Sequence, residues 1–509
     1  MRKIIHNILF TLAILSAASV YGQSQTYYVS TGGSDINAGT IDKPFLTISK
    51  AVSVVTAGGT IYVRGGTYSL TATISLSKSG AENAPISLLA YSGERPVLDF
   101  SDQELGNSNR GFVVSGSYWH IRGLDITGAG DNGMVISGGS NNLIELCNFY
   151  RNRDTGLQLD NGASDNTVRN CDSYYNADPP DYGDADGFAP KMGVGSGNYF
   201  YGCRAWFNCD DGWDGYLRGA DDVTSYIENC WTFSNGYFEN GDDAGENANG
   251  NGFKMGGSDD KDLKHNFTLK NCLAFANKAK GFDQNNNKGS MTLYNCTGHG
   301  NGGNNYSISQ ALADGKVLTI KNCVEFGDKV SIGSFAVQEN NSWLSPFVVT
   351  SDGFRSLDTT NVSGPRKADG SLPDIDYMHL ISGSDLINAG IDVGLAYAGS
   401  APDLGCFETG LSAIPDIGPP AGEVVCYPNP VNDIGYIKFT AERAGRCEVR
   451  LFDITGRQVR TLVDRNIDPG ENIIRFNLSD IREGLYMYRL SLNNTQLHVG
   501  RIIRLSSSR

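Results

Sequence analysis

The segment Leu269-Lys270-Asn271-Cys272 recurs in altered form through the middle of this 509-residue chain. Each copy alternates apolar and polar residues, as a short strand does, and ends in cysteine. Successive cysteines lie 24, 32, 27, 42, 24 and 27 residues apart, a spacing typical of a repeated structural unit. The other copies are Ile144-Glu145-Leu146-Cys147, Val168-Arg169-Asn170-Cys171, Tyr201-Gly202-Cys203, Ile227-Glu228-Asn229-Cys230, Leu293-Tyr294-Asn295-Cys296 and Ile320-Lys321-Asn322-Cys323.

A second column repeats as glycine followed by a large apolar residue. Units of this kind cannot bury their apolar side alone, so they must stack. We therefore predict an all-β chain dominated by a right-handed parallel β-helix, each unit being a strand, a turn and another strand, with neighbouring coils ~4.8 Å apart. The column comprises Gly133-Met134, Gly156-Leu157, Gly187-Phe188, Gly212-Trp213, Gly252-Phe253 and Gly281-Phe282.

The eleven cysteines do not form CxxC pairs. A ladder of unpaired, buried thiols is favoured over disulfides, because a free cysteine behaves as a small apolar residue. The aromatic residues of the glycine column, Trp213 included, are likewise expected in the core.

The composition changes at both ends of the chain. Residues Met1 to Gly22 have the basic start, apolar run and small-residue cleavage site of a secretory signal peptide, so we expect an exported protein. Phe45 to Val54 has helical spacing and is predicted to plug the β-helix, assigned to residues 23–410. A Pro- and Gly-rich linker at 411–423 then precedes longer alternating strands in 424–509, which indicate a small β-sandwich.

Net charge limits the partners. The formal charge of −15 argues against nucleic acid and anionic lipid, and it would repel an acidic sugar polymer unless a cation mediates the contact. No stretch after the signal peptide is apolar and long enough to span a membrane, and we expect a monomer. The six histidines are scattered and suggest neither a triad nor a metal set.

Four aspartates form the main candidate for a metal site. Asp186 occupies the position before Gly-aromatic that Asp211 occupies one coil later, so winding the chain brings it close to Asp210, Asp211 and Asp214. Carboxylates held this close raise one another's pKa unless a cation neutralises them. Oxygen ligands without paired histidines favour Ca²⁺. Solvated loops or a purely structural calcium site are the alternatives.

Lys254 is the candidate base. The same alignment places Asp214, Lys254 and Asp283 in one column, directly after the inward aromatic residues, so period-2 alternation turns them outward to solvent. A cation beside Lys254 would lower its pKa and leave a neutral amine able to accept a proton. A metal and a base are the groups needed to remove the weakly acidic proton at C5 of a uronate, next to its carboxylate.

Four further residues are candidate substrate contacts. Lys191, Arg204 and Arg218 could bind substrate carboxylates and Tyr216 could stack on a sugar, although each is equally consistent with an ordinary surface side chain. The remaining acidic runs lack a Gly-aromatic partner and are interpreted as solvated turns: Asp221-Asp222, Asp242-Asp243 and Asp259-Asp260.

From about Gln25 to Gly410 the chain resembles polysaccharide lyase family 9, the pectate-lyase-like β-helix enzymes. The motifs that carry the resemblance are Asp186-Gly187-Phe188-Ala189 with Lys191, Asp210-Asp211-Gly212-Trp213-Asp214, and Gly252-Phe253-Lys254 with Gly256-Gly257. The resemblance implies that the four aspartates hold Ca²⁺, that Lys254 is the base, and that the substrate is an acidic pectic polysaccharide, either polygalacturonate or rhamnogalacturonan. One departure is the acidic, Asn-rich stretch from Glu239 to Asn251.

The tail resembles the type A sorting domain of the type IX secretion system. It carries Tyr427-Pro428-Asn429-Pro430, the run from Leu451 to Arg457, Gly484-Leu485-Tyr486, and Gly500 to Leu505. This implies export through that machinery to the cell surface or beyond.

Two other functions remain open on the sequence. A non-catalytic carbohydrate-binding β-helix would use the aspartates for structural calcium, and Lys254 only for contact with an acidic sugar. A pectic hydrolase on the same fold would use carboxylates to deliver water and would work without a metal.

Overall fold

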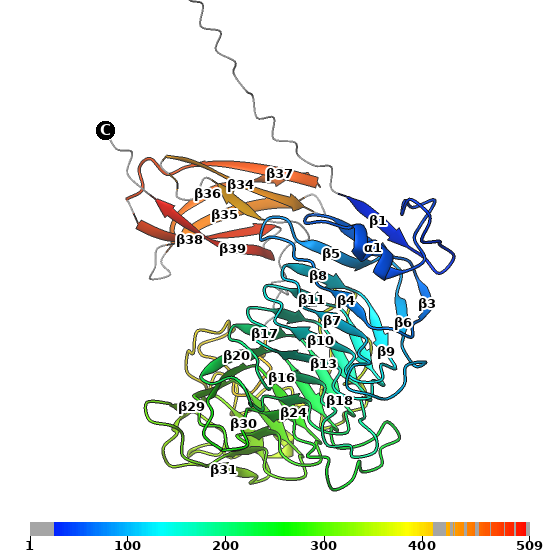
Figure 1. The fold of residues 1–509 in the computed structure, drawn as a ribbon. Coiled ribbons are helices and arrows are strands. Elements are labelled where there is room, and N and C mark those ends of the chain that lie inside the picture. The colour runs from blue at the N-terminus through cyan, green and yellow to red at the C-terminus, as the bar shows by residue number, and fades with distance from the viewer. Residues whose placement is uncertain are drawn as a thin grey trace, which may run out of the picture. The chain divides into compact units, whose positions relative to one another are not determined.

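Three parallel sheets wind around one axis and form a right-handed β-helix, as predicted (Figure 1). In this computed structural model the described residues are 25–410 and, within 424–504, everything except a few short loops. The predicted signal peptide and linker lie outside these residues. The chain divides into two compact units, Met1–Thr409 and Gly410–Arg509.

Each coil contains three strands, not the two that we expected, because the segment after each cysteine forms a short strand of its own. Every strand pairs in parallel with its counterpart one coil away. The first sheet contains β1 (Thr26–Val29), β2 (Thr60–Val63), β5 (Ile86–Ala90), β8 (Trp119–Arg122), β11 (Leu143–Glu145), β14 (Thr167–Arg169), β17 (Asn198–Tyr201), β20 (Val223–Glu228), β23 (His265–Lys270), β26 (Met291–Tyr294), β29 (Leu318–Lys321) and β32 (Val337–Glu339). The second contains β3 (Gly66–Ser69), β6 (Pro96–Asp99), β9 (Asp125–Thr127), β12 (Asn148–Tyr150), β15 (Asp172–Tyr174), β18 (Arg204–Trp206), β21 (Trp231–Phe233), β24 (Leu273–Phe275), β27 (Thr297–His299) and β30 (Val324–Phe326). The third contains β4 (Ile74–Leu76), β7 (Phe112–Val114), β10 (Met134–Ser137), β13 (Leu157–Asp160), β16 (Phe188–Pro190), β19 (Trp213–Asp214), β22 (Phe253–Lys254), β25 (Phe282–Asp283), β28 (Tyr306–Ile308) and β31 (Val330–Ile332).

The Asn-Cys pairs make the turn from the first sheet to the second. Asn271 and Asn295 both have φ of 51°, in the left-handed region that asparagine tolerates better than most residues. The cysteine that follows turns into the core. All eleven cysteines are unpaired, and those of the repeat are buried, which confirms the predicted ladder of thiols.

The glycine-aromatic column is an internal stack on the third sheet, as predicted. The rings of Phe188, Trp213, Phe253 and Phe282 follow one another with centroids 4.8, 4.9 and 5.3 Å apart. A second ladder lies in the turn from the second sheet to the third, where each buried asparagine donates from its amide to the side-chain oxygen of the next, at 2.8–3.0 Å. These ladders fix the register between coils. The asparagines are Asn152, Asn176, Asn208, Asn235, Asn277 and Asn301.

Two parts of the chain outside the three sheets pack against them: helix α1 and the segment after β32. Helix α1 (Ile48–Val54) is capped by Thr47 and packs beside β1, β2 and β4, within the predicted plug. After β32 the chain becomes loop-rich, as expected, with one 3-10 turn, η1 (Ser351–Gly353). This later segment packs its apolar side chains onto the second sheet, against residues such as Trp206 and Phe233.

The second unit is the predicted small antiparallel β-sandwich. One sheet contains β33 (Val425–Tyr427), β34 (Ile434–Ala441) and β37 (Gly470–Asn477). The other contains β36 (Gln458–Ile467), β35 (Gly445–Phe452), β38 (Gly484–Leu492) and β39 (Thr495–Arg504). Most of the Tyr427 to Pro430 motif and residues 453–457 lie outside the described residues.

Candidate active site

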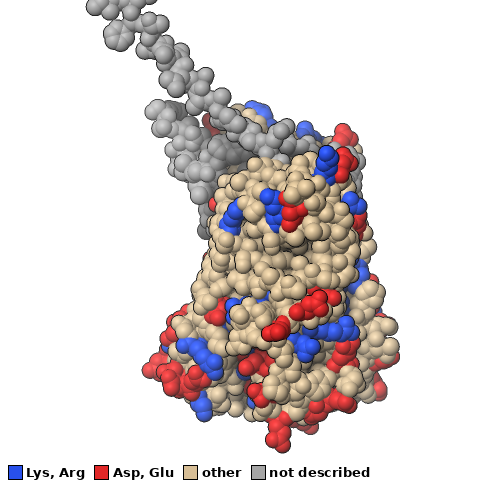
Figure 2. All heavy atoms as spheres, turned by 45° about the vertical axis from the view of Figure 1, so that its right-hand side comes forward, with Lys and Arg blue, Asp and Glu red and all other residues tan. Residues whose placement is uncertain are grey.

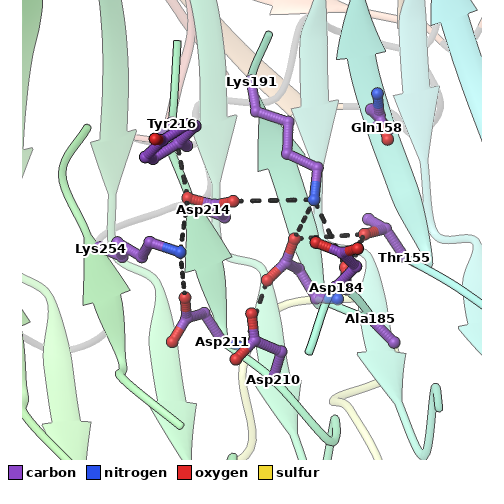
Figure 3. Close-up of polar contacts among 12 residues, drawn as sticks. Thr155, Gln158, Asp184, Ala185, Lys191, Asp210, Asp211, Asp214, Tyr216 and Lys254 are labelled. Atoms are coloured by element: carbon purple, nitrogen blue, oxygen red, sulfur yellow. Dashed lines mark hydrogen bonds and ion pairs between the residues drawn. The ribbon is translucent and has the colours of Figure 1, made fainter. Parts of the chain in front are cut away.

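Three aspartates from two successive coils meet at the start of β16 and β19. Figure 3 shows two of them, Asp210 and Asp211, near Lys254. Phe188 pairs with Trp213, which sets Asp186 beside Asp211, and the Asp211 amide donates to Asp186 Oδ1 at 3.2 Å. One carboxylate oxygen from each of Asp186, Asp210 and Asp211 lies within 4.8 Å of the others, and all three side chains are buried. The aligned Gly-aromatic motifs therefore predicted this juxtaposition.

Asp214 lies beside this group but faces two lysines. Its Oδ1 is 3.3 Å from Lys254 Nζ, and its Oδ2 is 3.6 Å from Lys191 Nζ. Oδ1 also accepts a hydrogen bond from the Tyr216 amide. Of the four predicted metal ligands, the structure thus groups three tightly and links the fourth to ammonium groups.

Lys254 lies where the register argument placed it. On β22 it pairs with Asp214 on β19 and with Asp283 on β25, and its Nζ is 2.9 Å from Asp211 Oδ2. It points away from the aromatic core, but it is not open to solvent as we had expected, since only 8% of the residue is exposed. The carboxylates and the Tyr216 ring, whose centroid is 5.8 Å from Nζ, surround the amine.

The cluster is short of positive charge. Burial raises the pKa of Asp186 and Asp210 well above the usual value, and neighbouring aspartates add to this effect. Burial also raises the pKa of Asp214, but Lys254 and Lys191 outweigh it and hold the value below the usual one. Burial lowers the pKa of Lys254, yet the four aspartates raise it well above normal. With these residues alone, Lys254 is a protonated ammonium group and not a base.

The donor set fits a hard divalent cation. It consists of carboxylate oxygens, as Ca²⁺ prefers. The contact between Asp211 Oδ2 and Lys254 is an ion pair without hydrogen-bond alignment, so this buried oxygen has no hydrogen-bond donor among the described residues. A buried carboxylate oxygen without a donor is costly, and a bound cation would compensate it.

Lys191 is a member of the cluster and not an exposed substrate contact. Its Nζ donates to Asp186 Oδ2 at 2.7 Å, and the residue is buried. Burial lowers the pKa of Lys191, but Asp186, Asp214 and Asp154 raise it above its ordinary value. The predicted grip on substrate is therefore replaced by an internal ion pair.

Tyr216 and Arg218 lie at the outer edge of the site. The Tyr216 hydroxyl donates to Asp259 Oδ1 at 2.7 Å, and Arg218 Nε donates to Asp259 Oδ2 at 3.1 Å. The guanidinium lies over the Tyr216 ring, 5.6 Å from its centroid, and 55% of the arginine side chain is exposed. Both residues are accessible for contact with a ligand.

Arg204 is an internal residue, so the prediction that it binds substrate carboxylates was wrong. It lies on β18 of the second sheet, is 2% exposed, and forms a bidentate pair with Asp172. Its Nη1 donates to the backbone oxygens of Val362 and Gly364 in the covering segment. All of these partners are internal, because residues more than 150 positions later in the chain close over the arginine.

Sequence reasoning missed Asn251, which donates two hydrogen bonds to Asp211 Oδ1. It stands directly before Gly252, the position that Asp186 and Asp211 hold in their own coils. The repeat alignment could have identified it, but an asparagine is a weaker sign of a metal site than the aspartates at the same position. The interpretation of the other acidic runs is borne out, since Asp221, Asp242 and their neighbours are exposed.

Comparison with known proteins gives consistent matches over the β-helix. Residues 27–331 match the family model described as Pel9A-like, right handed beta helix region. Pectate lyase L of Dickeya dadantii is 40% identical over 394 residues, covering 75% of this chain and 90% of that protein. Pectate lyase PEL9 of Emericella nidulans is 35% identical, covering 70% and 93%.

Two solved structures resemble the same region. The crystal structure of pectate lyase Pel9A has a TM-score of 0.70 and 39% identity, covering 76% of this chain and 97% of that one. A rhamnogalacturonan lyase has a TM-score of 0.61 and 30% identity, covering 70% and 97%. This chain belongs to the Pel9A-like family of right-handed β-helix proteins, and it is a polysaccharide lyase.

The second unit is matched separately. Residues 425–504 fit the family model of a secretion system C-terminal sorting domain. The chain is thus a substrate of type IX secretion, which delivers it to the cell surface or the extracellular space. None of the helices in the described part of the chain has the length and apolar character that a bilayer crossing requires.

Proposed function

We propose that this lyase is calcium-dependent and cleaves galacturonate-containing pectic polymer by β-elimination, with Lys254 as the base. The observation that carries the proposal is the contact between Lys254 Nζ and Asp211 and Asp214, at 2.9 and 3.3 Å, beside a buried group of carboxylates. An amine and an acidic cluster with more carboxylates than ammonium groups, together on one face, are the two parts that elimination from a uronate needs.

Asp186, Asp210 and Asp211 would hold the ion, with Asp214 at its margin. When bound, Ca²⁺ supplies positive charge that offsets these carboxylates and stabilises negative charge developing next to the sugar carboxylate. The same neutralisation removes the attraction that keeps Lys254 protonated.

Neutral Lys254 then accepts the C5 proton of the uronate. The C5–H electron pair forms the C4=C5 double bond, the C4–O bond breaks, and the departing oxygen takes a proton from solvent. Asp214 stays beside the resulting ammonium group and stabilises it. Because only 8% of Lys254 is exposed, little water surrounds its amine, which strengthens each of these electrostatic interactions.

Arg218 and Tyr216 are the proposed contacts for the polymer. On the face shown in Figure 2, acidic and basic side chains are most numerous over the lower part, fewer lie near the upper end, and a largely uncharged band separates them. Exposed cations such as Arg218 can bind sugar carboxylates despite the net charge of −15. The similar proteins include both pectate lyases and a rhamnogalacturonan lyase, so either galacturonate-containing backbone is a candidate substrate.

The test is to incubate the purified protein with polygalacturonate and with rhamnogalacturonan, with and without a calcium chelator. We expect an unsaturated product that absorbs in the ultraviolet from one polymer, and its loss on chelation, with recovery when Ca²⁺ is restored. Cleavage that persists in chelator would overturn the role of the cation. Cleavage without a new double bond would overturn β-elimination.

A further inference from the structure

A loop from Tyr237 to Asn249, here called the acidic loop, extends from the β-helix between β21 and β22. Its neck is closed by Gly236 and Gly250, whose φ angles are 88° and 68°. A Cβ on either glycine would come within 2.9 Å of the Cα of the other and would also collide with Lys278. Only glycine allows the two ends of the loop to approach this closely.

The loop is held down by packing and ion pairs. Phe238 meets the Tyr182 ring edge-on at 4.9 Å, and Ala244 and Ala248 are buried in a small apolar cluster with Ala185 and Cys209. On the outer side Glu239 pairs with Arg151 at 2.5 Å, and Asp243 pairs with Lys278 at 2.6 Å. The acidic loop therefore has a defined conformation, although part of it is exposed.

The inner end of the loop, and Asn251 just beyond its neck, donate hydrogen bonds to the aspartates of the site. The Asn249 amide donates to Asp210 Oδ1 at 2.5 Å. The Asn251 amide and its side-chain Nδ2 both donate to Asp211 Oδ1, at 2.6 and 2.9 Å. Two donors on Oδ1 fix the Asp211 carboxylate and turn Oδ2, which has no hydrogen-bond donor, toward Lys254.

Neutral residues bracket the two stacked carboxylates. In the position before glycine, successive coils carry Thr155, Asp186, Asp211 and Asn251, and the Thr155 hydroxyl lies 3.2 Å from Asp186 Oδ2. An aspartate in place of Asn251 would remove the side-chain donor and add a negative charge beside Asp211. An amide at this position instead stabilises Asp211 in its ionised form, because hydrogen bonds to a carboxylate favour the charged state.

We infer that Asn251 is a positioning residue, which orients Asp211 for cation binding and thereby sets the affinity of the site for Ca²⁺. The inference rests on the proposed function, since it assumes that the cluster binds this ion. Asn251 acts through Asp211 and does not itself contact the reacting sugar. Hydrogen-bond partners that orient metal ligands typically change metal affinity by about 10- to 100-fold when removed.

The experiment measures Ca²⁺ binding to the full-length protein by calorimetry, for the wild type, Asn251→Ala and Asn249→Ala. We expect the Kd of Asn251→Ala to rise by about 10-fold. Asn249→Ala is the matched control, since it keeps the backbone donor to Asp210 and loses only a 3.5 Å side-chain contact. Its Kd is expected to stay within about 2-fold of the wild type.

A second variant guards against a folding defect. Asn251→Thr places at this position the residue that a neighbouring coil already carries as Thr155, and its hydroxyl retains one donor. We expect its Kd to fall between those of the wild type and Asn251→Ala. The kcat of both variants should approach the wild-type value once Ca²⁺ is saturating, which a general structural defect would not allow.

The outcomes distinguish a failure of the proposed function from a failure of the positioning role of Asn251. If the wild type binds no Ca²⁺, the proposed function fails and this inference fails with it. If the wild type binds Ca²⁺ and Asn251→Ala binds it equally well, only the positioning role of Asn251 is overturned. A lowered kcat that excess Ca²⁺ does not restore would also overturn it.

Discussion

Two buried clusters of charged residues lie on different sheets of the β-helix and differ in their balance. On the second sheet, the single carboxylate of Asp172 receives bidentate hydrogen bonds from both Arg204 and Arg366. On the third sheet, four aspartates share two lysines. The first cluster has more cations than carboxylates, whereas the second has more carboxylates than cations.

The difference appears in the pKa values. Burial raises the pKa of Asp172, but Arg366 and Arg204 outweigh it and lower the value to about 2. In the acidic cluster burial raises the pKa of Asp186, Asp210 and Asp211, and their mutual repulsion contributes to the rise. A buried charge is costly when no opposite charge or hydrogen bond compensates it. A compensated cluster thus indicates a structural role, and an uncompensated one indicates a binding site.

Lys254→Ala should have the largest effect. Loss of the base is expected to lower kcat on the pectic substrate by about 10³-fold, within the range of general base catalysis. Ultraviolet detection of the unsaturated product measures this. Lys264→Ala, which removes an ammonium from an exposed pair with Asp221, is the control and should retain near wild-type kcat. Comparable rates for the two variants would remove Lys254 from the mechanism.

Arg204→Ala should affect stability and not catalysis. Asp172 keeps its pair with Arg366, but the backbone oxygens of Val362 and Gly364 lose their donor, which costs about 1–3 kcal/mol of unfolding free energy. Denaturant unfolding of the metal-free protein measures this, and the KM of the folded variant should not change. Arg218→Ala should show the opposite pattern. The exposed pair of Arg218 with Asp259 contributes under about 1 kcal/mol to the unfolding free energy, whereas loss of the arginine should raise the KM. A raised KM for Arg204→Ala would restore it as a substrate contact.

The Asp172 cluster should also give a specific pH dependence. A carboxyl group with a folded pKa of about 2, below its ordinary 3.8, contributes stability above pH ~4 that is lost as the pH falls through about 2. The unfolding free energies of wild type and Asp172→Asn should therefore differ by about 2 kcal/mol more at pH 5 than near pH 2. Unfolding curves at a series of pH values measure the difference. A constant difference would show that Asp172 does not titrate as described.

Asp210→Asn should have the smallest effect and the opposite sign. Removing one of several buried, repelling carboxylates is expected to stabilise the metal-free protein by about 1 kcal/mol and to weaken Ca²⁺ binding. The substituted amide can still accept the hydrogen bond from Asn249. Thermal unfolding with chelator, followed by Ca²⁺ titration, tests both parts. A destabilised metal-free variant would mean that the carboxylates do not repel one another in the folded state.

The sequence by itself determined the winding and the register of the site. The Gly-aromatic repeat aligned Asp186 with Asp211 and Asp214 with Lys254, because parallel strands on successive coils pair residue by residue and each apolar residue must face the core. Only the tertiary structure decided how far each side chain is buried and which partner it meets. Arg204 is closed over by residues around Val362, and Lys191 turns into the aspartates. The Arg204 contact depends on a loop from a distant part of the chain, and the Lys191 contact depends on how its side chain folds back over five residues. A repeat pattern encodes neither of them.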